Sequence, residues 1–223
     1  MLMVMRPSLS DIHGVLAAHS AVIVHFSGTP KGGGSTFEYP FPRDLEEVIA
    51  GRSLTGLSCS TVMPGDEFCD LNRANATGCI GVLLGLQTPQ SVLDAHPHDC
   101  GTYMADGVRQ VPHARDMTAS DFDATITGRA NGEYNEWVIA NYQVIGLFVA
   151  EPYRVSIEVE IDYPEDMPDY LRGAGTAAGF DYKSLAEIAT LFPNLPIYAF
   201  ASGGVVEHIG SAWVPVTHKT LYP

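Results

Sequence analysis

The longest apolar segment of the chain, residues 137–149, follows directly on a polar stretch. This change predicts a loop that leads into a buried strand beginning near Trp137. Apolar, β-branched runs bounded by Gly, Pro and Ser predict further strands at 21–26, 57–62 and 79–86.

Towards the C-terminus the apolar runs become shorter. Alternating apolar and polar residues predict a strand with one exposed face at 155–161, followed by a loop over 162–179. Three further strands are predicted at the end of the chain, of which the first two are joined by a hairpin through Ser202-Gly203-Gly204; they cover 197–201, 205–209 and 212–216.

Helix-capping patterns predict the helices. Ser8 with Asp11 begins a helix that ends near His19, and Ser184 with Glu187 begins one that runs through Phe192. Apolar residues at helical spacing predict another helix at 42–52. The same capping pattern predicts that a further short helix begins at Ser120. Residues 87–118 carry so many Pro and Gly breaks that they predict an irregular connection.

These elements predict an α+β protein with a mixed, largely antiparallel sheet and a few short helices, because strands outnumber helices without regular alternation. A length of 223 residues is suited to a single domain, 1–223. No apolar run is long enough to span a membrane.

The charge narrows the range of partners. Acidic residues outnumber basic ones by 26 to 12, giving a formal net charge of −14, and no Lys/Arg cluster is present. Such a chain repels phosphate backbones, so we expect a protein or small-molecule partner and not nucleic acid. Four cysteines without a C-x-x-C pair or a secretory segment are interpreted as reduced thiols in a cytoplasmic protein.

Three sets of polar residues lie at predicted strand ends: His25 on the first strand, Ser60 and Thr61 on the second, and Glu136 at the entry to the 137–149 strand. A helix is predicted between the first two. This order resembles the ADP-ribosyltransferase fold over roughly residues 21–149. The resemblance implies a split sheet that holds NAD, with the three motifs on strands one, two and five.

The resemblance also implies roles for these residues. Cleavage of the nicotinamide–ribose bond passes through a ribosyl cation, which the carboxylate of Glu136 would stabilise as the catalytic group. His25, with Ser27 and Gly28 of the same motif, and Ser60 or Thr61 would bind NAD as the substrate. An unknown acceptor, protein or small molecule, would receive ADP-ribose.

Two aromatic side chains are candidate stacking partners for nicotinamide, Tyr39 and Tyr142. Two features depart from the family. No tyrosine motif lies near Ser60, and the family's Glu-x-Glu pair appears here as Glu133-Tyr-Asn-Glu136, which is one residue longer. The acceptor therefore stays undetermined.

A competing hypothesis rests on the loop that carries His96, His98, Cys100 and His113. Two imidazoles in a His-x-His pattern fall on one face of an extended segment, as they do in several zinc sites. In that case the protein would be a metal-dependent hydrolase or would carry a structural zinc. A third hypothesis, based on charge alone, is a non-catalytic acidic module that binds a basic protein.

Overall fold

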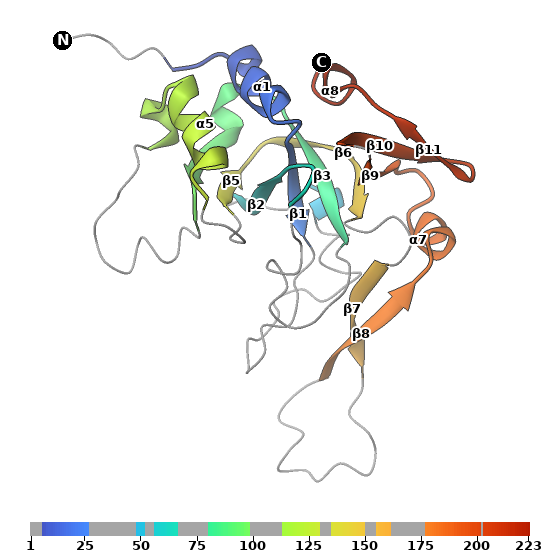
Figure 1. The fold of residues 1–223 in the computed structure, drawn as a ribbon. Helices are drawn as coiled ribbons and strands as arrows, with labels where there is room; N and C mark the ends of the chain where they lie inside the picture. The colour runs from blue at the N-terminus through green and yellow to red at the C-terminus, as the bar shows by residue number, and fades with distance from the viewer. Residues whose placement is uncertain are drawn as a thin grey trace, which may run out of the picture.

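The structure is a computed structural model, and it describes residues 6–26, 48–51, 56–66, 80–98, 113–129, 135–149, 155–161, 177–201 and 203–223 (Figure 1). In chain order the elements are α1 (Leu9–Ala18), β1 (Val22–Phe26), β2 (Leu57–Val62), β3 (Ile80–Leu86), η1 (Pro89–Ser91), β4 (Val92–His96), η2 (Ala114–Asp116), α5 (Ala119–Thr127), β5 (Glu136–Ile139), β6 (Tyr142–Val149), β7 (Val155–Ile161), β8 (Ala177–Lys183), α7 (Leu185–Leu191), β9 (Ile197–Ala201), β10 (Gly204–Ile209), β11 (Ala212–Pro215) and α8 (His218–Leu221).

Nine of these strands form one sheet in the order β11-β10-β9-β6-β3-β1-β2-β5-β4, and β7 pairs with β8 separately. Within the described strands, every pair is antiparallel except β6 with β9. The predicted α+β class with a mixed, largely antiparallel sheet is therefore confirmed.

The connection between β5 and β6 shows that this sheet is not flat. In the strand order, β6 and β5 are separated by β3, β1 and β2, which in a flat sheet would place them roughly 19 Å apart. Only Ala140 and Asn141 join them, and such a link reaches about 11 Å at most. The sheet must therefore bend back on itself, and Figure 1 shows the chain arching from β5 into β6.

Strand β2 changes its pairing partner halfway along its length. Its first half, Leu57 to Cys59, pairs with β5, whereas its second half, Ser60 to Val62, pairs with β1. On one side of β2 lie β5 and β4, and on the other side lie β1, β3, β6, β9, β10 and β11. Strand β2 thus changes its pairing partner between Cys59 and Ser60.

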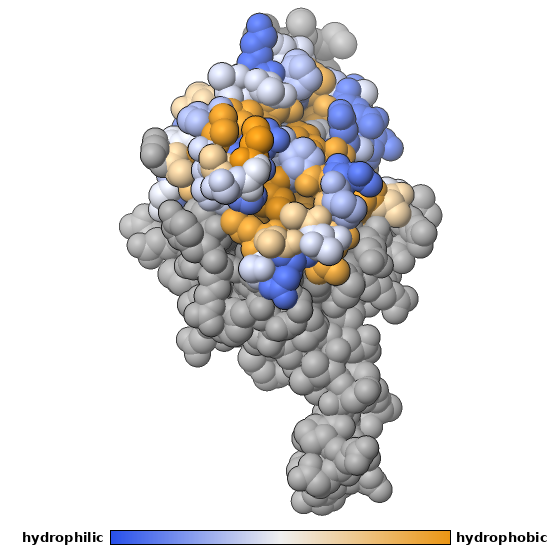
Figure 2. All heavy atoms as spheres, turned by 90° about the vertical axis from the view of Figure 1, so that its right-hand side faces the viewer, coloured by the Kyte–Doolittle hydropathy of each residue, from blue (hydrophilic) through white to orange (hydrophobic). Residues whose placement is uncertain are grey.

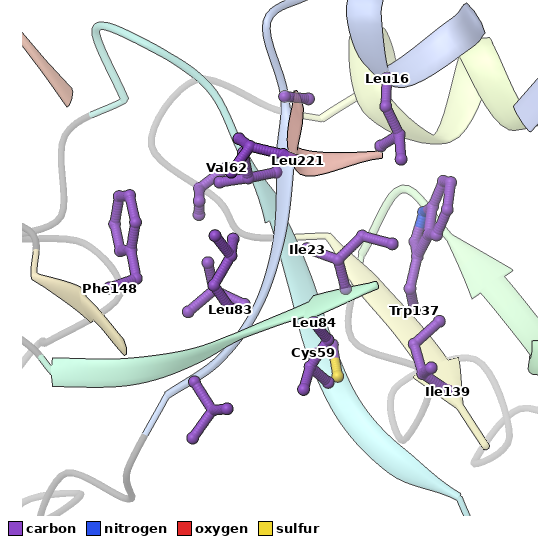
Figure 3. Close-up of a cluster of buried hydrophobic side chains, with 14 of the residues drawn as sticks. Leu16, Ile23, Cys59, Val62, Leu83, Leu84, Trp137, Ile139, Phe148 and Leu221 are labelled. Carbon is purple, nitrogen blue, oxygen red and sulfur yellow. The ribbon is translucent and has the colours of Figure 1, made fainter. Parts of the chain in front are cut away.

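The apolar core lies on both faces of the central strands. Figure 3 shows Leu83 and Phe148 on one side of β1 and Leu84, Trp137 and Ile139 on the other. Burial of Trp137 is completed by α5, whose Phe122 ring lies 5.3 Å from the indole, centroid to centroid. A hydrogen bond of 2.7 Å between His19 Nε2 and the Asp123 carboxylate joins the end of α1 to α5.

Capping explains where the helices begin. The predicted boxes are confirmed at Ser8 with Asp11 and at Ser184 with Glu187, where each hydroxyl accepts from the backbone N–H of its partner. The start predicted at Ser120 is wrong by two residues. Thr118 is the N-cap of α5 and Asp121 completes its box. Of the predicted helix at 42–52, only a helical turn at 48–51 lies within the described residues.

Other predictions about the strands need correction. The segment 137–149 is two strands, because Asn141 takes a left-handed conformation with φ of 49° between β5 and β6. Strand β4 lies inside the region predicted to be irregular, and β8 begins inside the predicted loop 162–179. Each of these strands forms by pairing with another strand, and the local sequence pattern does not reveal such pairing.

The strands at the C-terminal end of the sheet expose apolar side chains. Ile209 of β10 and Val214 of β11 are 54% and 40% exposed, and their pairing with Ala212 and Glu207 places them on one face. Figure 2, which shows the right-hand side of Figure 1, has apolar side chains gathered in the middle of this side with polar ones around them. Among the described helices, none is long and apolar enough to cross a membrane.

Two histidines and a tyrosine attach α8 to the rest of the fold. Tyr222 stacks between His13 of α1 and His218 of α8, with ring centroids 5.2 and 4.6 Å away. The Tyr222 hydroxyl accepts from the backbone N–H of Ile23, and His218 Nε2 donates to the Ala21 carbonyl. The C-terminus is thus fixed to the start of β1.

We expect this attachment to weaken in acid. Burial lowers the pKa of His13, as does the neighbouring His218, and burial also lowers the pKa of His218. Because the unfolded chain then binds these protons more readily, the free energy of unfolding should be greatest above pH 6.5, the ordinary histidine value, and should fall as the pH is lowered below it. Thermal denaturation between about pH 5 and 8 measures this slope.

A double variant, His13→Leu with His218→Gln, should flatten the pH dependence, since glutamine can still donate to Ala21. The matched control is His208→Gln, because His208 stacks on Trp213 at the far end of the sheet. An unchanged slope in the double variant would refute the assignment.

Candidate functional site

His25 and Glu136 lie next to the point at which β2 changes its partner, on the two strands that flank β2. The pairing of β1 with β2 ends at Val24 and Ser60, and the pairing of β2 with β5 ends at Cys59 and Trp137. His25 is the next residue along β1, and Glu136 is the residue before Trp137 on β5. Each of the two therefore lies one residue beyond the last pair that its strand makes with β2.

Glu136 and Ser60 face each other at this point. Continuing the β2–β5 register by one step places Glu136 across from Ser60, and on its other side Glu136 is paired with His96 of β4. The side chain of Glu136 is half-buried, and Ser60 is 8% exposed. Burial raises the pKa of the neighbouring Cys59 thiol, and the negative charge of Glu136 raises it further. The charge of Glu136 is therefore close enough to act on the buried Cys59 thiol.

His25 lies where β1 and β2 separate. Alternation along β1 alone would direct its ring to the face opposite that of Ser60. Its Nδ1, however, is 2.7 Å from the carbonyl oxygen of Ser58, so the imidazole crosses the gap between the two strands. A carbonyl only accepts, hence Nδ1 carries the proton, and in the neutral ring Nε2 is the acceptor.

Thr61 has a different surrounding from Ser60. It is completely buried, and its hydroxyl and backbone N–H are both bonded to the side chain of Asn135. A direct contact between Thr61 and a ligand is therefore not supported, and of the two predicted alternatives Ser60 is the one with residual exposure.

A buried amide attaches the start of β5 to β2 and α5. Asn135 Oδ1 accepts from the Thr61 N–H at 2.9 Å, and its Nδ2 donates to the Thr61 hydroxyl and, at 2.9 Å, to the Thr125 carbonyl. The indole N–H of Trp137 donates to the Thr125 hydroxyl at 2.9 Å. Both neighbours of Glu136 are thus held against α5.

An ion pair holds the end of α5 against the turn after β2. The guanidinium of Arg129 donates to both carboxylate oxygens of Asp66 at 2.9 and 3.0 Å, and also to the carbonyls of Thr61 and Ile126. The Asp66 carboxylate in addition accepts from the Met63 N–H. The turn itself, with Pro64 and Gly65 at its centre, is closed by the Asp66 N–H, which donates to the Met63 carbonyl.

The competing metal hypothesis is represented here only in part. His96 is buried, with its Nε2 3.3 Å from the Asp94 carboxylate, whereas His113 is exposed at the start of η2. Cys100 lies outside the described residues. Among those that are described, no group of three or more His, Cys, Asp or Glu side chains is placed to hold a metal ion.

The remaining predicted residues are placed as follows. Tyr142 bonds the Val48 carbonyl through its hydroxyl, so its described contact is with the helical turn at 48–51. Ser27, Gly28, Tyr39 and Glu133 lie outside the described residues. Cys59 is a free, buried thiol.

Sequence reasoning missed the residues that hold the site together, namely Asn135, Arg129, Asp66 and Thr125. Asn135, Arg129 and Asp66 act through partners far away in the sequence; Asn135 and Thr61, for example, are 74 residues apart. Thr125 bonds Asn135 and Trp137 across the connection between α5 and β5. One local signal was present, because an uncharged amide next to Glu136 at the start of an apolar strand must find buried partners.

The chain was compared with protein-family models, with curated proteins and with solved structures, and none of the three comparisons finds a match.

Proposed function

We propose that this chain is an NAD-consuming enzyme of the ADP-ribosyltransferase type, with Glu136 as its essential carboxylate. One observation supports the proposal: His25, Ser60 and Glu136 lie on three neighbouring strands, β1, β2 and β5, next to the point where β2 changes its pairing partner. The resemblance puts its three motifs on strands one, two and five. Nothing in the sequence pattern alone requires β1, β2 and β5 to be neighbours.

The chemistry suits a half-buried carboxylate next to the point where β2 changes its partner. The bond between ribose C1′ and the nicotinamide nitrogen breaks, and nicotinamide leaves with the bonding electrons. The ribosyl cation that develops is stabilised by the negative charge of Glu136, which also accepts a hydrogen bond from a ribose hydroxyl. The acceptor's lone pair then forms a new bond to C1′, and the acceptor loses a proton.

The neighbouring residues would orient NAD. His25 Nε2, whose acceptor character follows from the Nδ1 bond to Ser58, would accept from a hydroxyl of the adenosine ribose. The Ser60 hydroxyl would orient Glu136 or the nicotinamide ribose. We infer that the acceptor is a protein or a small molecule, because a net charge of −14 repels nucleic acid.

The test is release of nicotinamide from NAD by the purified chain, measured by chromatography. We expect the wild type to release nicotinamide and Glu136→Gln to lower kcat about a hundredfold or more, because glutamine keeps the shape but loses the charge. The control is Glu207→Gln on β10, which pairs with β9 and β11 and with none of β1, β2 and β5, so this change should leave kcat unchanged. The proposal fails if the wild type releases no nicotinamide at millimolar NAD, or if Glu136→Gln keeps the wild-type rate.

A further inference from the structure

The amide of Asn135 replaces a strand partner beyond the end of a ladder. The backbone pairing of β2 with β5 stops at Cys59 and Trp137, yet the N–H of Thr61 still has an acceptor on the β5 side, which is Asn135 Oδ1. The Nδ2 of the same amide donates to the Thr61 hydroxyl and to the Thr125 carbonyl. Three bonds therefore fix a side chain that is completely buried.

This arrangement fixes the position of Glu136. Its two neighbours, Asn135 and Trp137, point to the same side of β5 and are both bonded to Thr125 of α5. Glu136, between them, points to the other side. A residue whose two neighbours are held by buried hydrogen bonds has little freedom to shift its Cα or to change the direction of its side chain.

We propose that Asn135 is a positioning residue that holds the carboxylate of Glu136 next to the point where β2 changes its partner. The inference rests on the proposed function. Asparagine is suited to this place because it accepts from an N–H and donates twice from one short side chain. Aspartate would set a charge against the Thr125 carbonyl, and glutamine would need room for another methylene group in a packed interior.

The test compares Asn135→Ala with wild type in the nicotinamide-release assay, with rates calculated per folded molecule. We expect kcat to fall about tenfold to a hundredfold while the KM for NAD stays within about threefold, because a carboxylate displaced by an ångström still leaves the NAD contacts of other residues in place. A purely structural role would lower the thermal midpoint without changing kcat per folded molecule.

Ser91→Ala is the matched control. Ser91 is also completely buried, and its hydroxyl bonds the Asn141 carbonyl at 2.9 Å, just beyond the other end of β5. If general loosening of β5 lowered the rate, Ser91→Ala would lower kcat as much as Asn135→Ala does. We expect Ser91→Ala to reduce stability but to keep the wild-type kcat.

A milder variant covers the case in which Asn135→Ala does not fold. Thr61→Val removes only the hydroxyl that accepts from Asn135 Nδ2, and we expect a smaller fall in kcat in the same direction. In the double variant, Asn135→Ala with Thr61→Val, kcat should fall no further than in Asn135→Ala alone, since both changes break the same hydrogen-bond network. The inference is overturned if wild type is faster than Glu136→Gln but Asn135→Ala keeps the wild-type kcat. If Asn135→Ala does not fold, the same reading applies to Thr61→Val. Absence of wild-type activity instead overturns the proposed function, and this inference with it.

Discussion

Replacing Trp137 by alanine is expected to lower the free energy of unfolding by about 3–5 kcal/mol, the usual cost of emptying a fully buried tryptophan site. The indole is 0% exposed and packs against Phe122 of α5. Its N–H bond to the Thr125 hydroxyl is lost as well. Urea denaturation followed by circular dichroism measures the change, and the slope m shows whether unfolding stays two-state.

The other tryptophan provides the control. Trp213 is half-buried on the edge strand β11, where its ring lies 4.9 Å from that of His208. Trp213→Ala should therefore cost much less than Trp137→Ala. Trp137→Phe should cost about 1–2 kcal/mol, because it keeps most of the packing and loses one hydrogen bond. Equal losses for the two alanine variants would contradict the placement of Trp137 in the core.

Trp137 also limits how Glu136 can be studied. Because the two residues are adjacent on β5, a variant that loosens the indole also loosens the strand that carries the carboxylate. Activity of Trp137 variants should therefore be measured well below their unfolding transitions. A loss of rate that tracks the unfolded fraction reflects stability and not catalysis.

Elements that depend on local pattern could be predicted from the sequence. Strands β2 and β9 begin and end where their apolar runs do, and the helix starts at Ser8 and Ser184 follow from hydroxyl and carboxylate spacing. The hairpin between β9 and β10 was likewise predictable from its glycines. Gly203 takes φ of 80° there, a conformation that favours glycine.

Elements that depend on a distant partner could not be predicted. Strand β4 carries the polar residues Asp94 and His96, and it is a strand because β5 pairs with it. The break at Asn141 follows from the bent sheet, in which β5 and β6 lie on different sides of β2. In both cases the deciding pairs join residues that are forty or more positions apart in the sequence.

The candidate site, too, has parts that the sequence could predict and parts that it could not. The order of His25, Ser60 and Glu136 along the chain was visible, and the resemblance assigned them to strands one, two and five. The exchange of partners at Cys59 and Ser60 is a matter of strand register, which no single motif reveals. The roles of Asn135 and Arg129 follow only from their side-chain bonds to β2. The sequence shows an amide and a guanidinium but does not identify their hydrogen-bond partners.

The ion pair between Arg129 and Asp66 is expected to be the other large contributor to stability. Arg129→Met should lower the free energy of unfolding by about 3–4 kcal/mol, because removing the cation leaves a largely buried carboxylate without its partner. The two side chains are only 11% and 19% exposed, and the guanidinium also bonds the Thr61 carbonyl. Urea denaturation at pH 7 measures the loss.

A double-mutant cycle separates the pair from its surroundings. Asp66→Asn keeps an acceptor for the Met63 N–H, so Arg129→Met with Asp66→Asn should be more stable than the sum of the single losses predicts. Arg115→Met is the control, because Arg115 is 73% exposed beside Asp116 and should contribute almost nothing. If Arg129→Met were as mild as Arg115→Met, the attachment of α5 to β2 would depend on packing and on the bonds of Asn135 to Thr61 and Thr125.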